Sequence, residues 1–313
     1  MKRLGALVLA LGLIGGAIAV NRAIHGTDSA DDGTDGASGA KLRVVCATEF
    51  SAACDALATD TTIAEVATFT TQAPGATVDA LVTDPSPTFD LWLTSAPWPA
   101  IATARAQAAD RPTARVAQAS SPLASSALSA VARSATAASI TSTCTPFSAT
   151  CLLTGTSTIG LRPTTETAGM LAVGAFIATW PGLEDPDIVA IDTDDAFRSA
   201  FSNTKARARF DSGPVRTILT QPKFAVALDL DAEGQLAAAS NRAQFTAMPT
   251  SVSAVAVAVP AATSTGRGAL DRIGRRAVVS ALTDLGWSTK IPDDDGLPEP
   301  AVLDQLVSRW NTR

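Results

Sequence analysis

Lys41-Leu-Arg-Val-Val-Cys-Ala-Thr-Glu-Phe50 decides the fold class, because a short apolar run passes directly into polar residues that suit a turn. The segment 42–46 is typical of a buried strand. Farther along the chain, short β-rich runs alternate with stretches of helical character. This alternation predicts an α/β fold, with mostly parallel sheets flanked by helices.

The expected elements follow from local patterns of apolar residues and from capping signals. After the first strand, strands are expected at 76–81, 89–94, 114–122, 158–162, 223–230 and 251–260. Helices are expected as a short turn at 62–65, at 97–109 and 123–137, from 164–166, from about 194, and at 268–285 and 298–310.

The first 21 residues predict contact with a membrane. Lys2 and Arg3 precede an apolar stretch over 4–20, which is longer than the roughly 7–15 residues of a signal's apolar region. An uncleaved anchor is therefore preferred, with a cleaved secretory signal as the alternative. Both place the rest of the chain outside the cytoplasm, either single-pass in the cell membrane or secreted. Residues 22–40 read as a disordered acidic tether.

Composition limits the function classes. The chain has 313 residues, a net charge of −6 and scattered basic residues, which argue against a nucleic-acid surface. The only histidine is His25, so neither a Ser-His-Asp triad nor a His-ligated zinc site has its members. The S-x-x-K spacing at 202–205 lacks its companion motifs. The sequence predicts no enzyme and no cofactor, and a hydrolase with paired carboxylates remains the weakest alternative.

Four cysteines fall into two close pairs, Cys46 with Cys54 and Cys144 with Cys151. An even number in an exported chain favours disulfides, and three connectivities are open, of which local pairing is the simplest. The competing interpretation is a four-thiolate metal site, whose usual C-x2-C spacing is absent.

Several short segments carry a family resemblance: 44–49, 89–95 with Trp98, 119–122, 160–165 with Ala168 and Gly169, and 296–303. Their order resembles the type II periplasmic solute-binding fold of molybdate- and sulfate-binding proteins. More closely, it resembles an actinobacterial extracellular solute-binding-like family often found beside or fused to von Willebrand A domains, although this chain has no von Willebrand A segment. The resemblance implies lobe 1 at 41–121 plus 259–313 and lobe 2 at 122–258, with a ligand in the cleft between them.

The candidate ligand-binding residues stand mostly at turns between expected strands and helices. They are Thr48, Glu49, Ser95, Trp98, Ser120, Ser121, Thr164 and Thr165. Hydroxyls and free helix N–H groups together suit an anion, although the same residues also serve as ordinary N-caps. Glu49 would repel an anion, and Trp98 would either stack on a ligand or pack in the core.

Two functions remain. The first is an extracytoplasmic solute-binding-like protein that holds a small ligand, for example an anion, without catalysis. The second is a membrane-anchored module with a degenerate cleft, which recruits an envelope protein or transporter. Hydroxyls that converge on one open point would favour the first function, and hydroxyls that cap one another would favour the second.

Overall fold

A computed structural model describes residues 40–181, 188–238 and 244–312, which belong to one compact unit that begins at Ala40. The expected membrane segment 1–21 and the tether up to residue 39 lie outside these residues. Within the described residues, no helix has both the length and the apolar character that a membrane crossing requires.

One mixed sheet organises the described residues, in the strand order β2-β1-β3-β8-β4-β7-β5-β6. The strands are β1 (Leu42–Ala47), β2 (Ala67–Gln72), β3 (Leu91–Ser95), β4 (Ala124–Arg133), β5 (Ile159–Leu161), β6 (Ala208–Phe210), β7 (Val226–Leu230) and β8 (Phe245–Pro260). Pairs at the two ends are parallel, whereas β3–β8, β8–β4 and β4–β7 are antiparallel. We call β2, β1 and β3 the β1 end of the sheet, and β7, β5 and β6 the β5 end.

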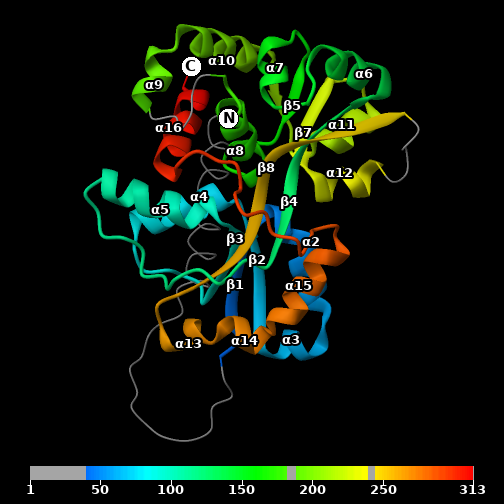
Figure 1. The fold of residues 1–313 in the computed structure, drawn as a ribbon. Helices are drawn as coiled ribbons and strands as arrows, with labels where there is room; N and C mark the ends of the chain where they lie inside the picture. Colours follow the sequence, from blue (N-terminus) through cyan, green and yellow to red (C-terminus); the bar gives the residue numbers. More distant parts are fainter. Residues whose placement is uncertain (1–39, 182–187, 239–243, 313) are drawn as a thin grey trace, which may run out of the picture. The chain divides into compact units, whose positions relative to one another are not determined.

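The long strands β4 and β8 run through the middle of the molecule and connect the two ends of the sheet (Figure 1). Helices of the β1 end are α2 (Ser51–Thr59), α3 (Thr61–Val66), α4 (Pro74–Thr83), α5 (Pro97–Ala108), α13 (Ser264–Arg267), α14 (Ala269–Ile273) and α15 (Arg275–Asp284), with the 3-10 turn η1 (Thr48–Phe50). Helices of the β5 end are α6 (Ser134–Thr143), α7 (Thr150–Thr154), α8 (Thr167–Ala178), α9 (Ile188–Thr193), α10 (Asp195–Arg207), α11 (Pro214–Thr220) and α12 (Asp231–Ala238).

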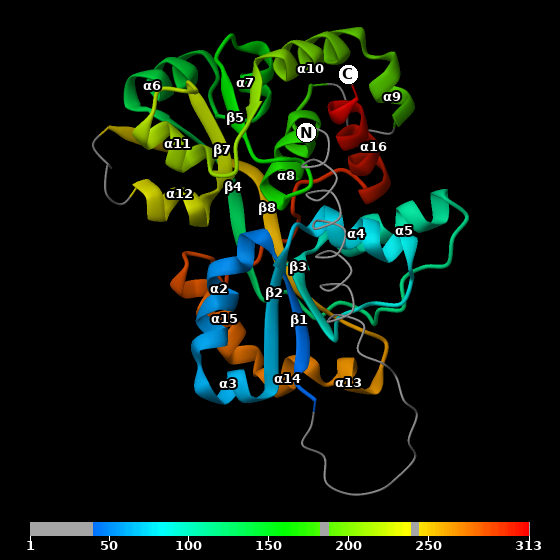
Figure 2. The ribbon, with the colours of Figure 1, turned by 180° about the vertical axis from the view of Figure 1, so that it is seen from behind.

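The last helix, α16 (Pro300–Asn311), packs against both ends of the molecule and lies beside α8 in both views (Figures 1 and 2). Leu303 and Leu306 are fully buried, and the ring of Trp310 lies 5.7 Å from that of Phe176 in α8. Toward α5, Arg105 donates from Nε to Asp304 Oδ1 at 2.8 Å. The C-terminal helix therefore joins α5 to α8.

The local pairing of the cysteines is confirmed. Cys46 at the end of β1 is bonded to Cys54 in α2, and Cys144, directly after α6, is bonded to Cys151 in α7. The first bond ties a strand to the helix that follows it, across the turn where Thr48 and Glu49 lie.

The predictions for 114–122 and 123–137 were wrong. Residues 114–122 contribute only an isolated bridge from Val116 to Ala261, and the expected helix begins instead as the strand β4. Alanine favours helices by less than 1 kcal/mol per residue over most others, and pairing on both sides outweighs that preference. Leu128 and Ala130 are fully buried in β4, which pairs with β8 on one side and β7 on the other.

The strand expected at 76–81 is instead the helix α4. Pro74 begins it, and Val78 and Leu81 share its buried side at a spacing of three. The strand lies earlier, in the β-branched run of β2. The single helix expected at 268–285 is divided at Gly274, whose φ of 92° interrupts a helix.

Candidate functional site

The ends of β1, β3 and β5 bring polar side chains together around one carboxyl group, that of Glu49. Glu49 lies in η1 directly after β1, Ser95 is the last residue of β3, and Thr167 begins α8 after β5. Glu49 Oε1 accepts hydrogen bonds from Ser95 Oγ at 2.9 Å and from Thr167 Oγ1. Trp98 Nε1 donates to Thr167 Oγ1 at 2.8 Å. The Thr167 oxygen therefore accepts from the indole, while its proton is donated to Glu49. We call these four residues the Glu49 cluster.

The Glu49 cluster is almost free of solvent. Ser95 and Thr167 are 0% exposed and Trp98 is 2% exposed, while Glu49 as a residue is half-buried but its Oε2 is buried. Glu49 Oε2 and the neighbouring Thr48 Oγ1 have no hydrogen-bond partner among the residues that the structure describes. Burial raises the pKa of Glu49 above its ordinary value of 4.5, against the two hydroxyl bonds, and the nearby charge of Glu166 adds a smaller effect in the same direction.

This raised pKa predicts a pH-dependent stability. Because the folded state holds Glu49 protonated to a higher pH than the unfolded chain does, its stabilising contribution is complete below about 4.5 and declines as pH rises through the folded-state pKa. Relative to Glu49→Gln, which is neutral at every pH, the free energy of unfolding of the wild type should therefore fall above pH 4.5. Urea unfolding between pH 4.5 and 8 measures this difference. The same comparison of the wild type with Glu65→Gln serves as control, because Glu65 is exposed. A difference in free energy of unfolding between the wild type and Glu49→Gln that stays constant with pH would contradict the prediction.

The remaining predicted residues separate into two places. Thr164 is buried and donates to Asn311 Oδ1 of α16 at 3.0 Å, while the carbonyl of the exposed Thr165 accepts from the N–H of Gly75 in α4 at 2.9 Å. Both lie in the turn between β5 and α8, two or three residues before Thr167 in the chain. Ser120 and Ser121 lie elsewhere, in the loop before β4, where Ser120 Oγ donates to the Ser121 carbonyl and accepts from the Ala258 N–H.

A buried charge network lies at the ends of β5 and β7. Arg162 donates from Nε to Asp229 Oδ1 at 2.8 Å and from Nη1 to Glu166 Oε2 at 3.1 Å, and its Nη2 is 3.7 Å from Glu233 Oε2. The Asp229 side chain is only 2% exposed. Burial raises the pKa of Asp229 to about 6, even though Arg162 attracts the ionised form.

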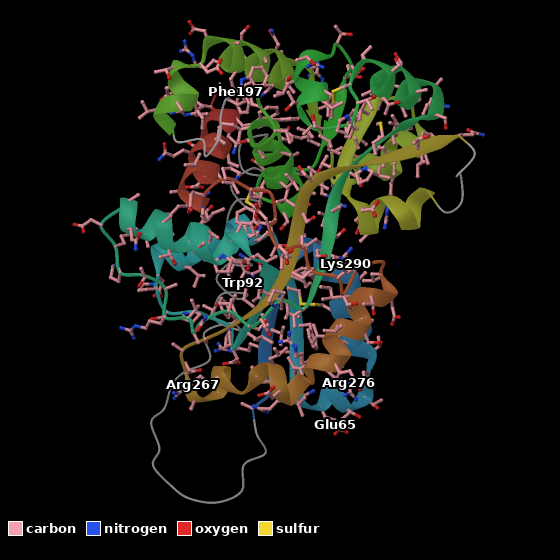
Figure 3. All side chains as sticks on the ribbon, viewed as in Figure 1. Glu65, Trp92, Phe197, Arg267, Arg276 and Lys290 are labelled. Carbon is pink, nitrogen blue, oxygen red and sulfur yellow. A yellow bond between two sulfur atoms is a disulfide. The ribbon has the colours of Figure 1, made fainter. Side chains whose placement is uncertain are left out.

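A polar hollow of about 310 Å³ lies beside β4 and β8. Its polar lining comprises Ser125, Ser126, Asp231, Ser253, Ser288 and Lys290. Ser125 and Ser126 belong to β4, Asp231 begins α12, and the exposed Lys290 follows α15. Figure 3 places Lys290 at the level between α12 and α15. We call this feature the serine hollow.

The segment that carries Lys290 is held firmly against β4. Ser125 exchanges backbone hydrogen bonds with Ser288 at 2.8 Å, and Ser125 Oγ donates to the Lys290 carbonyl at 2.8 Å. On the other side, Ser126 Oγ accepts from the Ala232 N–H of α12 at 3.0 Å. Elements of both ends of the sheet thus form the walls of the serine hollow. Within the described parts of the chain, no group of three or more His, Cys, Asp or Glu residues is arranged to hold a metal ion.

The sequence and the structure were compared with those of known proteins. No family model and no curated protein matches the sequence. Among solved structures, iron-bound HitA from Pseudomonas aeruginosa matches with a TM-score of 0.57 and 12% identity, over 88% of this chain and 100% of that one. AfuA from Actinobacillus pleuropneumoniae, with exogenous fructose-6-phosphate bound, matches with a TM-score of 0.57 and 10% identity, over 86% and 97%. The fold is that of the two-lobed type II periplasmic binding proteins.

A putative extracellular solute-binding protein from Bordetella parapertussis has the same fold, with a TM-score of 0.52 and 9% identity over 86% of this chain and 96% of that one. The expected type II binding-protein fold is thus confirmed, while the narrower resemblance to an actinobacterial family stays a prediction. In this chain, β4 and β8 connect the β1 end of the sheet to the β5 end. The Glu49 cluster and the serine hollow both include residues from the two ends of the sheet.

Sequence reasoning missed Thr167, Arg162 and the whole serine hollow. Arg162 carried a usable signal, since a charged residue directly follows the buried strand β5. Ser125 and Ser126 also carried one, as a polar pair inside an apolar run, but the expected helix hid it. Lys290 and Asp231 showed no local pattern, because only the folded chain brings α12 and the segment after α15 to β4.

Proposed function

We propose that this chain is an extracytoplasmic solute-binding protein that holds a small polar solute in the serine hollow and performs no catalysis. The observation that carries the proposal is the hollow itself, a volume of about 310 Å³ that is lined by four serines, by Lys290 and by Asp231, the first residue of α12. That volume is at the lower end of the range for ligand pockets, so a small solute suits it.

The fold supports the same proposal. HitA is described with iron and AfuA with fructose-6-phosphate, so the two-lobed architecture serves binding proteins with unlike ligands. The lobes proposed for this chain are 41–121 plus 259–313 and 122–258, with residues 1–21 as the anchor or signal that places them outside the cytoplasm. Lys290 in the first lobe and Asp231 in the second would then face the solute from opposite walls.

A thermal-shift panel of oxyanions, amino acids, sugars and polyamines tests the function on the oxidised full-length protein. A solute at about 100 times its dissociation constant adds about 2.7 kcal/mol to the free energy of unfolding, which corresponds to a rise in Tm of roughly 5–10 °C. Lys290→Met should abolish the shift that the best solute produces. Arg276→Met, an exposed cation on α15 away from the hollow, should retain it (Figure 3).

The competing function is an envelope interaction module whose original cleft no longer binds a solute. The bonding of the predicted hydroxyls favours it, because Ser95 donates to Glu49 and Thr164 donates to Asn311 within the protein. No response of the wild type to any member of the panel would support this alternative. A rise in Tm with a solute that Lys290→Met leaves unchanged would instead show that the solute binds outside the serine hollow.

A further inference from the structure

Ligands of open α/β sheets bind outside the carboxyl ends of the strands, and the corresponding place in this molecule is already filled. The carboxyl ends of β1 and β3 and the start of α8 after β5 surround the Glu49 carboxyl group. In the turn that leads to Thr167, the Thr165 carbonyl accepts a hydrogen bond from the Gly75 N–H of α4 at 2.9 Å, which joins this turn to the β1 end of the sheet.

The groups around Glu49 have the chemistry of a site for an acid. Ser95 Oγ and Thr167 Oγ1 both donate to a single carboxyl oxygen, and the Trp98 indole N–H fixes the threonine hydroxyl in that role. These hydroxyls come from both ends of the sheet and are fully buried. Buried polar groups are costly to desolvate unless they are bonded, so the hydroxyls need an acceptor at this position.

The match between Glu49 and this site is incomplete. Among the described residues, neither Glu49 Oε2 nor Thr48 Oγ1 has a hydrogen-bond partner although both atoms are buried, and such atoms are rare in folded proteins. The site therefore satisfies only one oxygen of the tethered carboxyl group. A free carboxylate is not held by the backbone of Glu49 and can turn so that its second oxygen meets a donor such as the Thr48 hydroxyl.

We infer that the Glu49 side chain acts as a built-in ligand, occupying a carboxylic-acid site at the strand ends, and that the site accepts a free small carboxylate once this side chain is removed. The inference is separate from the solute proposed for the serine hollow, since the two sites share no residue. The raised pKa of Glu49 agrees with a tightly enclosed acid.

The test is chemical rescue of Glu49→Ala in the oxidised full-length protein. Acetate is the probe, because its methyl and carboxyl groups match the atoms that the substitution removes. Tm is measured in increasing sodium acetate, with sodium chloride added to keep the ionic strength constant. The variant is expected to melt several degrees below the wild type in chloride, and acetate should raise its Tm along a saturable curve.

Three comparisons make the rescue specific. The wild type, Glu49→Gln and the exposed Glu65→Ala should show no saturable rise, because the first two fill the site and the third never touched it. A Tm of Glu49→Ala that changes with acetate only as the wild type does would overturn the inference, and so would equal rescue of Glu65→Ala. If Glu49→Ala does not fold in chloride, refolding becomes the readout: recovery in acetate alone supports the inference, and failure in both salts contradicts it.

The outcomes are also distinct from those of the solute screen. Lys290→Met changes the serine hollow and leaves the Glu49 cluster intact, so acetate rescue of Glu49→Ala should persist in the double variant. Loss of rescue in that double variant would show that the two sites are one, and would overturn their assignment as separate sites.

Discussion

Arg162→Met is expected to lower the free energy of unfolding by about 3–5 kcal/mol, the usual cost of removing one partner of a buried ion pair. The methionine fills most of the arginine's volume, so the loss comes chiefly from charge. Asp229, 2% exposed and 2.8 Å from Arg162 Nε, would remain buried with no cation beside it. Glu166, which Arg162 also bonds, would lose the same partner.

The pH dependence of this loss identifies its cause. Burial already raises the pKa of Asp229 to about 6, and removal of Arg162 removes the attraction that opposes this rise. The loss should therefore be smaller at pH 5, where Asp229 can be neutral, and larger at pH 8. Urea unfolding at both values measures it. Arg216→Met is the matched control, because Arg216 is 81% exposed although it approaches the same Glu233 at 3.9 Å, and its effect should stay below about 1 kcal/mol. An equal loss in both variants would contradict the prediction.

Gly169→Ala is the second substitution with a large expected effect, about 3 kcal/mol of destabilisation. A Cβ at this position would lie 2.3 Å from the Pro163 carbonyl oxygen and 2.4 Å from that of Arg162. Alanine gains about 1 kcal/mol over glycine inside a helix such as α8, but overpacking costs about 1–3 kcal/mol even where flexible side chains yield. Because backbone atoms obstruct this Cβ, either α8 or the turn after β5 must move, so the cost lies above that range, at about 4 kcal/mol, and about 3 kcal/mol remains after the helical gain.

A decrease in Tm of roughly 6–12 °C is the expected measurement for Gly169→Ala. Gly268→Ala is the control, since a Cβ there meets nothing within 4 Å and its φ of −103° suits any residue. Its Tm should change by no more than a degree or two. A tolerated Gly169→Ala would mean that α8 does not depend on its close approach to the turn, and the position of Thr167 would then rest on its hydrogen bonds alone.

The sequence was informative where a local rule acts alone. Strands β1 and β3, the helices α5 and α10 and the two disulfides follow patterns that neighbouring residues define, and all were predicted nearly in place. The positions of Thr48, Glu49 and Ser95 at strand ends were predicted for the same reason, because a strand end can be recognised from its own residues, while their role in binding stays a prediction.

Prediction failed where partners distant in sequence decide the outcome. The alanine-rich run 124–133 became β4 only because β7 and β8 flank it, and neither is near it in sequence. The hydrogen-bond partners of the hydroxyls could not be predicted from local sequence either. Ser95 was expected to face a ligand and Thr167 was not among the candidates, whereas the hydroxyls of both donate to a carboxyl group of the same chain.

The central place of β8 has a consequence for the order in which the protein can form. β3 pairs with β8 from Leu91 with Pro260 to Ser95 with Ala256, and β4 pairs with the same strand on its other side. A nascent chain that has not yet reached Phe245 therefore presents two open sheet edges, one on β3 and one on β4, with no native strand to cover them. Such edges invite pairing with other chains, and their closure requires contacts between residues far apart in sequence, which form slowly. The interval before β8 is available is thus the period in which this protein most needs protection from aggregation.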